Sequence, residues 1–168
     1  MRIGYLIFFV FYLLSCKDTE VNNERLKIKS EDDNNQSLKI IDSLKVVCFK
    51  EFKLVFSQFN KEFNLWYSPK LVVNGDTVSI AGFNNENGSE LSINKSPNSN
   101  YFVIDNIIKG YVENGNGEKI LHENFMCVIV NVKKAKVEQS LQSECDGVWN
   151  EQNEWVSAGN VVFAPLEK

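Results

Sequence analysis

Six large aromatic side chains recur at helical spacing in the first third of the chain, and this pattern constrains the fold more than any other feature of the sequence. They lie alternately three and four positions apart, and they are Phe49, Phe52, Phe56, Phe59, Phe63 and Trp66. Steps of three and four place such side chains on one face of a helix. Lys50, Lys53 and Lys61 fall largely on the opposite face, so the spacing predicts an amphipathic helix.

The predicted helix begins at about residue 38 or 43 and ends at Trp66. Asp42 or Ser43 can cap its start, and Pro69 is typical of the segment after its end. Each large aromatic side chain buries about 150 Å² or more. We therefore expect the aromatic face to pack on a sheet, with a partner-binding face or a ligand groove as the alternative.

The rest of the chain has the pattern of antiparallel strands. β-Branched residues on both sides of Asn74-Gly75 predict a hairpin with a type I′ turn. A second turn is predicted at 114–117, in the middle of the apolar stretch 101–132. The polar stretch 84–100 is interpreted as a loop with one short edge strand at 90–94.

Two further extended segments, around 136–149 and 154–164, complete a predicted meander of about five to seven strands. The sequence thus predicts an α+β fold, in which a long N-terminal amphipathic helix packs on a curved antiparallel β-sheet. The chain length and the apolar content of 43 % suit a single globular domain over residues 37–168.

The N-terminal segment has the composition of an export signal. It reads MRIGYLIFFVFYLLSC, with one basic residue before an apolar run from Ile3 to Leu14. As a helix this run would cover only about 18 Å, well short of the roughly 30 Å core of a bilayer. Charged residues begin at Lys17. A basic start, a short apolar run and a small residue before a cleavage point are typical of a secretory signal.

The end of this segment, Leu13-Leu14-Ser15-Cys16, resembles the lipobox of bacterial lipoproteins. The resemblance covers residues 1–16 only. It implies that residues 1–15 are removed as a signal peptide, that a diacylglycerol is attached to the sulfur of Cys16, and that the new amino group is acylated by a fatty acid such as palmitate. Each buried CH₂ of these chains contributes about 0.8 kcal/mol, so Cys16 would be a membrane anchor. The alternative is an ordinary secreted protein with a cysteine at the cleavage point.

Residues 16–36 form the predicted lipidated cysteine and a flexible tether, because this polar segment has too few apolar residues to offset the entropy of ordering it. The expected location is the cell envelope, at the outer membrane, with the periplasmic and surface faces both open. CKDTE weakly resembles an acidic surface-export signal, and a solvated linker is the alternative. The net charge of −4 disfavours binding of nucleic acid, whose binders concentrate positive charge.

With Cys16 assigned to lipid, Cys48, Cys127 and Cys145 remain, an odd number in an oxidising compartment. Three pairings can be drawn. We expect a Cys127–Cys145 disulfide because both residues lie in the strand-rich part, and a bridge of this size would contribute about 3 kcal/mol. Cys48, beside Phe49, is interpreted as a small buried thiol on the helix.

No sequence motif for catalysis or metal binding is present. A Cys-x-x-Cys pair is absent, and His122-Glu123 lacks the second histidine of a zinc-protease motif because Met126 stands in its place. A Gly-x-Ser-x-Gly nucleophile motif is absent too. We therefore expect no catalytic residue, no metal and no cofactor other than the lipid on Cys16. A pair of converging carboxylates remains open among the 22 acidic residues.

Two tryptophans form the candidate binding surface. Trp149 and Trp155 flank a turn-like NEQN stretch, so they can face each other across a hairpin and close the core. The functional alternative is a stacking platform for a sugar or a peptide, favoured by the polar residues around them.

The sequence favours an exported, membrane-anchored lipoprotein with a non-catalytic domain that binds a protein partner or a cell-envelope polymer. Inhibitor and immunity proteins belong to this class. A structural accessory subunit of an outer-membrane complex is the alternative. A hydrolase with dispersed carboxylates is the third hypothesis, and the missing nucleophile and metal motifs weigh against it.

Overall fold

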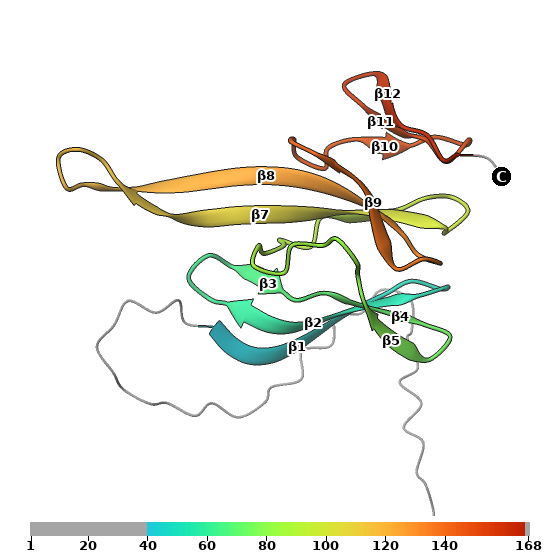
Figure 1. The fold of residues 1–168 in the computed structure, drawn as a ribbon, viewed down its shortest axis with the longest axis horizontal. Helices are drawn as coiled ribbons and strands as arrows, with labels where there is room; N and C mark the ends of the chain where they lie inside the picture. Colours follow the sequence, from blue (N-terminus) through green and yellow to red (C-terminus); the bar gives the residue numbers. More distant parts are fainter. Residues whose placement is uncertain (1–39, 167–168) are drawn as a thin grey trace, which may run out of the picture.

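The computed structural model describes residues 40–166, and this part of the chain contains strands and no helix (Figure 1). The predictions for residues 1–36, including the lipid on Cys16, concern residues outside the described part. No segment of the described part is a helix long and apolar enough to cross a bilayer. In chain order the strands are β1 (Ile40–Cys48), β2 (Lys53–Asn60), β3 (Leu65–Tyr67), β4 (Lys70–Val73), β5 (Asp76–Ser79), β6 (Ile93–Lys95), β7 (Tyr101–Glu113), β8 (Lys119–Asn131), β9 (Lys136–Leu141), β10 (Val148–Trp149), β11 (Trp155–Ser157) and β12 (Asn160–Phe163).

The α+β prediction is therefore wrong, because the stretch predicted to be the long helix forms β1, β2 and β3 instead. Burial in β2 has the period of a strand: Leu54 and Phe56 are fully buried, while Ser57 is exposed. Residues four apart lie on one face of a helix, but they also lie on one face of a strand. The spacing of Phe52 and Phe56 thus fitted both.

Of the other aromatic residues in the pattern, Phe49 and Phe63 lie in turns, whereas Phe59 lies in β2 and Trp66 in β3. Phe49 N–H donates to Phe52 O at 2.8 Å in the β1–β2 turn, and their rings lie 4.7 Å apart. In the turn after β2, Asn60 Oδ1 accepts hydrogen bonds from the backbone of Glu62 and Phe63. Because Asn60 ends the strand in this way, the last aromatic residues belong to a turn and to β3 rather than to a continuing helix.

Three antiparallel sheets stack as layers in Figure 1. The first sheet has the order β1-β2-β4-β5, with β3 also paired to β2. The second sheet has the order β6-β7-β8-β9 and lies above the first, and the third sheet, β10-β11-β12, lies above the second at the C-terminal end. Every pairing inside these sheets is antiparallel.

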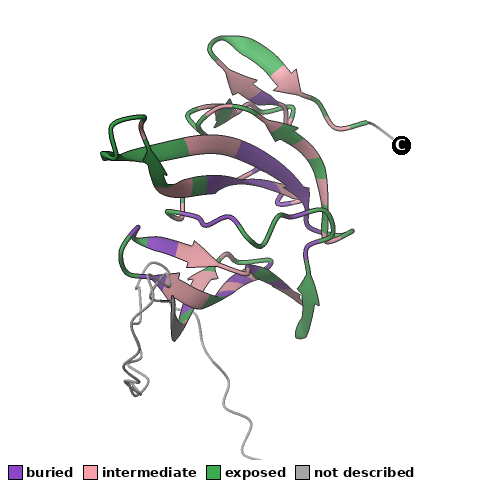
Figure 2. Cartoon of the chain, turned by 60° about the vertical axis from the view of Figure 1, so that its left-hand side comes forward, coloured by how far each residue is buried: buried purple, intermediate pink, exposed green. Residues whose placement is uncertain are grey.

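The main hydrophobic core fills the space between the first and second sheets, where buried segments face each other (Figure 2). Its fully buried members include Leu54, Phe56 and Leu71 from the first sheet and Phe102 and Ile104 from the second. A smaller core lies between the second and third sheets, formed by Val103, Cys127, Ile129 and Trp155 with partly buried neighbours. The long stretch 84–100 runs between the two lower layers and contains β6.

The local turn predictions are confirmed. β4 and β5 form the hairpin predicted at Asn74-Gly75, and both residues have the positive φ that a type I′ turn requires, 53° and 92°. β7 and β8 flank the turn predicted at 114–117 and pair over their full length. The edge strand predicted at 90–94 occurs slightly later, as β6. The predicted number of five to seven strands was too small. The prediction assigned β1, β2 and β3 to a helix, and nine further strands, β4 to β12, follow them in the described chain.

Candidate functional site

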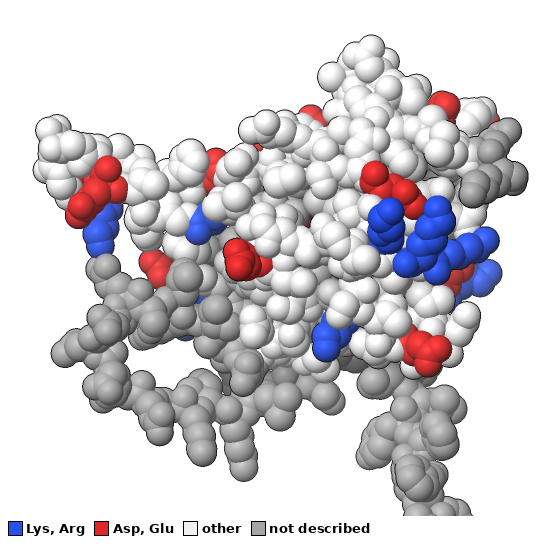
Figure 3. Space-filling view, viewed as in Figure 1, with Lys and Arg blue, Asp and Glu red and all other residues white. Residues whose placement is uncertain are grey.

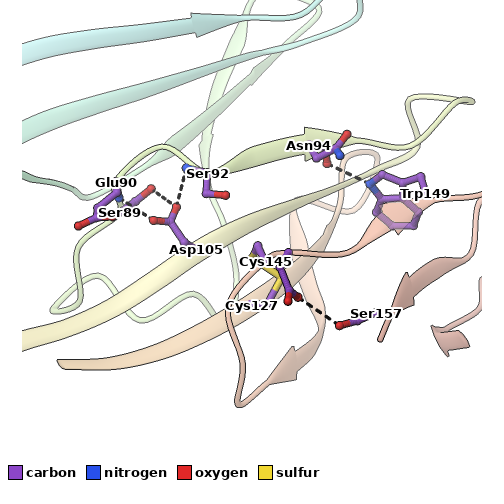
Figure 4. Close-up of a disulfide and its surroundings, with 10 residues drawn as sticks. Ser89, Glu90, Ser92, Asn94, Asp105, Cys127, Cys145, Trp149 and Ser157 are labelled. Atoms are coloured by element: carbon purple, nitrogen blue, oxygen red, sulfur yellow. Dashed lines mark hydrogen bonds between the residues drawn. A yellow bond between two sulfur atoms is a disulfide. The ribbon is translucent and has the colours of Figure 1, made fainter. Parts of the chain in front are cut away.

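The predicted Cys127–Cys145 disulfide is present (Figure 4). It joins the buried part of β8 to the segment after β9, and the two Cα atoms lie 4.9 Å apart. Through this bond the second sheet is linked to the chain that enters the third sheet. Cys48 is not on a helix but on β1, where it is exposed.

The two predicted surface tryptophans mainly close the smaller core. Trp149 and Trp155 pair across the β10–β11 hairpin with ring centres 5.3 Å apart. Trp155 is only 1 % exposed, so it has no surface to offer a ligand. Trp149 is half-buried, and its Nε1–H donates to Asn94 O at 3.1 Å (Figure 4). Of the predicted pair, only Trp149 contributes to the surface.

A buried carboxylate closes an irregular stretch beside β7 (Figure 4). Asp105 is 5 % exposed, and its carboxylate accepts hydrogen bonds from Ser89 Oγ at 2.6 Å, Glu90 N–H at 2.6 Å and Ser92 N–H at 3.1 Å. These donors precede β6, where the backbone does not form a regular ladder with β7. The carboxylate of Asp105 thus accepts hydrogen bonds that backbone carbonyl groups would accept in a regular ladder. Burial raises the pKa of Asp105, and the hydrogen bonds from Ser89, Glu90 and Ser92 oppose this shift.

We expect Asp105→Asn to lower the free energy of unfolding by about 1–3 kcal/mol at neutral pH, since an amide can accept only through one oxygen and leaves buried donors without a partner. A raised carboxyl pKa means that the folded state binds the proton more tightly. The contribution of Asp105 to stability is therefore largest below its ordinary pKa of 3.8 and is lost as pH rises through the folded-state pKa.

Urea unfolding of both proteins at pH 4.5 and 7.5 checks this prediction. The wild-type chain should gain stability relative to the Asp105→Asn variant on acidification. If the difference in unfolding free energy between the wild-type chain and the variant became smaller at pH 4.5, the folded chain would instead stabilise Asp105 as a carboxylate.

The outer half of the β7–β8 hairpin is the most unusual surface of the described chain. The inner halves of the two strands are buried against both neighbouring sheets, but beyond Ile107 and Phe125 the ribbon projects from the body (Figures 1 and 2). We call this projecting part, residues 108–124, the arm. It presents five large apolar side chains that are 43–53 % exposed: Ile108, Tyr111, Val112, Ile120 and Leu121.

Cross-strand register arranges the side chains of the arm. Tyr111 lies opposite Leu121, and Val112 lies opposite Ile120. Since directly opposite residues point to the same face of a ribbon, these two pairs occupy opposite faces. Tyr111 also contacts Phe63 below it, with ring centres 5.8 Å apart. The arm therefore exposes apolar surface on both faces.

Charged pairs flank these apolar residues. Lys109 Nζ contacts the carboxylate of Glu123 directly across the ribbon and lies 3.4 Å from Glu90 Oε1. The hydrogen bond that Lys109 donates to Glu123 is the main reason why the pKa of Lys109 is raised. Nearer the turn, Glu113 lies opposite Lys119. Figure 3 shows acidic and basic side chains adjoining near the free end of the arm.

A groove of about 280 Å³ lies where the arm leaves the body. Gln58 of β2 and Tyr67 of β3 form one wall, and Ile108 and Lys109 of β7 form another. The loop residues Asn85 and Glu86 complete the lining. Because Ile108 belongs to both the groove and the arm, the two surfaces are continuous.

Buried carboxylates are rare in the described part of the chain. Asp105 is the only buried carboxylate among the described residues whose burial is known, so this part of the chain holds no buried carboxylate pair of the kind that cleaves glycosides. His122 is exposed on β8. Between residues 40 and 166, three or more His, Cys, Asp or Glu residues nowhere gather as a metal site would require.

Sequence reasoning missed the arm. One signal could have indicated it: the two extended stretches on either side of the turn at 114–117 are each 13 residues long, whereas strands in globular proteins are usually about 5–6 residues long. A pair of such strands extends beyond its neighbours unless they are equally long.

Comparison with known proteins yields no relative for this chain: no family model, no curated protein and no solved structure matches it.

Proposed function

We propose that this chain is an exported, lipid-anchored protein that binds a partner protein through the arm and carries out no catalysis. The observation that carries the proposal is the exposure of Ile108, Tyr111, Val112, Ile120 and Leu121 on a ribbon that projects from the body. Exposed apolar pairs on both faces of a projecting ribbon indicate an interaction site, because soluble domains rarely leave much apolar surface uncovered.

Apart from Tyr111, whose ring contacts the buried Phe63, the fold does not require these apolar residues. The hydrophobic clusters of the described chain reach the hairpin only as far as Ile107 and Phe125. A cross-strand pair contributes about 0.2–1 kcal/mol to a hairpin, and threonine or charged pairs could supply that contribution without exposing apolar surface. A partner that covers the arm explains the choice of valine, isoleucine and leucine there.

The composition of the arm favours a protein over a polysaccharide. Flat aromatic rings are the side chains that stack on the C–H faces of sugars, and Tyr111 is the only aromatic residue among the exposed large apolar side chains of the described part. Branched aliphatic side chains instead suit the apolar surface of a protein. The narrow ribbon shape also differs from the broad flat patch expected of a structural accessory subunit.

Export and anchoring rest on the sequence. The lipobox-like LLSC at residues 13–16 supports acylation of Cys16, and the polar residues that follow support a tether. The Cys127–Cys145 disulfide supports an oxidising compartment, since structural disulfides persist outside the cytoplasm. A tethered domain would hold the arm within reach of proteins of the same membrane.

Photo-cross-linking in intact cells tests the binding surface. A photoreactive amino acid placed at Val112 of the full chain should form a discrete cross-linked product with a second protein. The matched control is Val161 of β12, which is 53 % exposed against 50 % for Val112. The same product from both positions, or none from Val112, would contradict the proposal.

Mass analysis of the chain isolated from its native membrane tests the anchor separately. We expect a new N-terminus at Cys16 carrying acyl mass, and release of a Cys16→Ala variant from the membrane fraction. An intact initiating methionine would contradict this part of the proposal and leave the binding test unaffected.

A further inference from the structure

Along one edge of the arm, no other described segment pairs with the backbone of β7, and the direction of its backbone groups defines what could pair there. Ile107 N–H donates to Gly88 O at 2.7 Å, and Gly88 N–H donates to Ile107 O at 2.9 Å. Ile107 therefore directs its backbone groups away from β8. Because this direction alternates along a strand, Lys109, Tyr111 and Glu113 also direct their N–H and C=O groups outward.

No backbone hydrogen bond within the described part reaches these three residues on that edge. The chain that accompanies β7 along its inner half begins at Gly88, and the preceding residues turn away, with Asn87 N–H donating to Asn84 O at 3.4 Å. The groove described above lies at this point, beside Ile108 and Lys109. A strand that added to the free edge would end in the groove.

The sequence of this edge is complementary to itself. An antiparallel copy of β7 centred on Tyr111 would place Lys109 opposite Glu113 of the second copy, and Tyr111 opposite its own equivalent. All three residues present outward backbone groups, so each of these pairs would be a hydrogen-bonded one. Opposite charges and aromatic pairs are the favourable cross-strand combinations.

The same complementarity would extend from β7 to the β8 strand of each copy. In the resulting four-stranded sheet, Glu123, Lys109, and the second copy's Glu113 and Lys119 would form a row of alternating charge, because Glu123 already faces Lys109 and Glu113 already faces Lys119. The central row would be apolar, with Leu121 and Tyr111 from each copy. The turn at 114–117, rich in Asn and Gly, would reach the groove of the other copy.

We propose that the free edge of β7 pairs with the same edge of a second copy of this chain, so that two arms form one four-stranded antiparallel sheet with a two-fold axis at Tyr111. Such a contact is isologous and closed, as in most dimers. It goes beyond the proposed function, because it uses the backbone edge of the arm and leaves the Val112–Ile120 face open. The dimer would therefore present two copies of the Val112–Ile120 face.

The opposite edge of the arm provides a matched control. Leu121 and Glu123 of β8 also direct backbone groups outward, since they lie opposite Tyr111 and Lys109. An edge pair centred on Leu121 would also place Glu123 opposite Lys119 of the second copy, but its central pair would be two leucines rather than two tyrosines. The groove that could receive the turn lies at the end of the β7 edge. We therefore assign the contact to the edge of β7.

Two pairs of variants of the full chain, expressed in its native membrane, test the proposal. Tyr111→Cys should form a covalent dimer on non-reducing electrophoresis at least tenfold more efficiently than Leu121→Cys. Tyr111→Pro removes an outward N–H without disturbing the β7–β8 ladder, and edge strands tolerate proline there. It should reduce by at least tenfold the carbodiimide cross-links between Lys109 and Glu113 of differently isotope-labelled copies.

Leu121→Pro, which removes the equivalent N–H on the other edge, should leave these inter-copy cross-links unchanged, and the thermal unfolding of both proline variants reports whether the fold is intact. Three results would each overturn the proposal. The inter-copy cross-links could be lost only in Leu121→Pro, both cysteine variants could form dimers equally well, or Tyr111→Cys could form no dimer. None of these results bears on the Val112 photo-cross-link to a different protein.

Discussion

Replacing Phe56 with alanine is expected to lower the free energy of unfolding by about 3–5 kcal/mol, the usual loss for a large aromatic residue removed from a core. Phe56 has no exposed surface and lies in the cluster between the first and second sheets. The second sheet contributes Phe102 and Ile104 to the same cluster. Residues of both sheets surround Phe56 and cannot fully fill the cavity that its side chain would leave. The free energy of unfolding should therefore fall by most of the amount expected for an unfilled cavity. Chemical denaturation followed by circular dichroism measures it.

Phe59→Ala is the matched control. Phe59 is half-exposed on the other face of β2 and packs on Trp66 with ring centres 4.6 Å apart, so its replacement should cost about 1 kcal/mol, in the range of a single aromatic pair. On the aromatic face of a helix the two residues would be equivalent. Equal losses of stability in Phe56→Ala and Phe59→Ala would therefore contradict the assignment of this segment to a strand.

Removing the Cys127–Cys145 bridge is the second change with a large expected effect. The bond closes a loop of 18 residues, for which the loss of chain entropy in the unfolded state corresponds to about 3 kcal/mol. Cys127 has no exposed surface and lies in the cluster with Trp155. We expect Cys145→Ser to lower the melting temperature by roughly 10 °C for a domain of this size.

Differential scanning calorimetry checks the disulfide prediction, and near-ultraviolet circular dichroism of the tryptophan pair should change in parallel. Glu144→Ser is the control, because Glu144 is exposed in the same loop and takes no part in the bridge. It should alter stability by less than about 0.5 kcal/mol. A Cys145→Ser variant as stable as this control would mean that the third sheet is held by its packing alone.

Local chemistry made the hairpins predictable. The positive φ angles at Asn74 and Gly75 follow from residue types that tolerate them, and the turn at 114–117 has the same origin. The first three strands were not predictable in this way. A four-residue step fits both a helix and a strand, and the decisive turn depends on the hydrogen bonds of Asn60 Oδ1, which only the folded chain reveals.

The residues of the candidate site were also predictable only in part. The Cys127–Cys145 pair could be predicted because both residues lie in strand-rich sequence. The burial of Trp155 and the exposure of Val112 could not, because both depend on contacts between distant segments. Trp155 is covered when the third sheet packs on β7 and β8, and Val112 is exposed because β6 and β9 are shorter than the strands they accompany.

The central claim is that the arm serves binding rather than folding. Co-isolation of partners from the native membrane, using the full chain with Val112→Asp and Ile120→Asp together, tests it most directly. The control carries Val148→Asp and Val161→Asp, which alter positions of the third sheet that are at least as exposed as those of the arm. We predict that the arm variant stays folded, losing little more than the stability of one cross-strand pair, and that it loses a partner that both the wild-type and control chains retain. A folded arm variant that keeps every partner would contradict it.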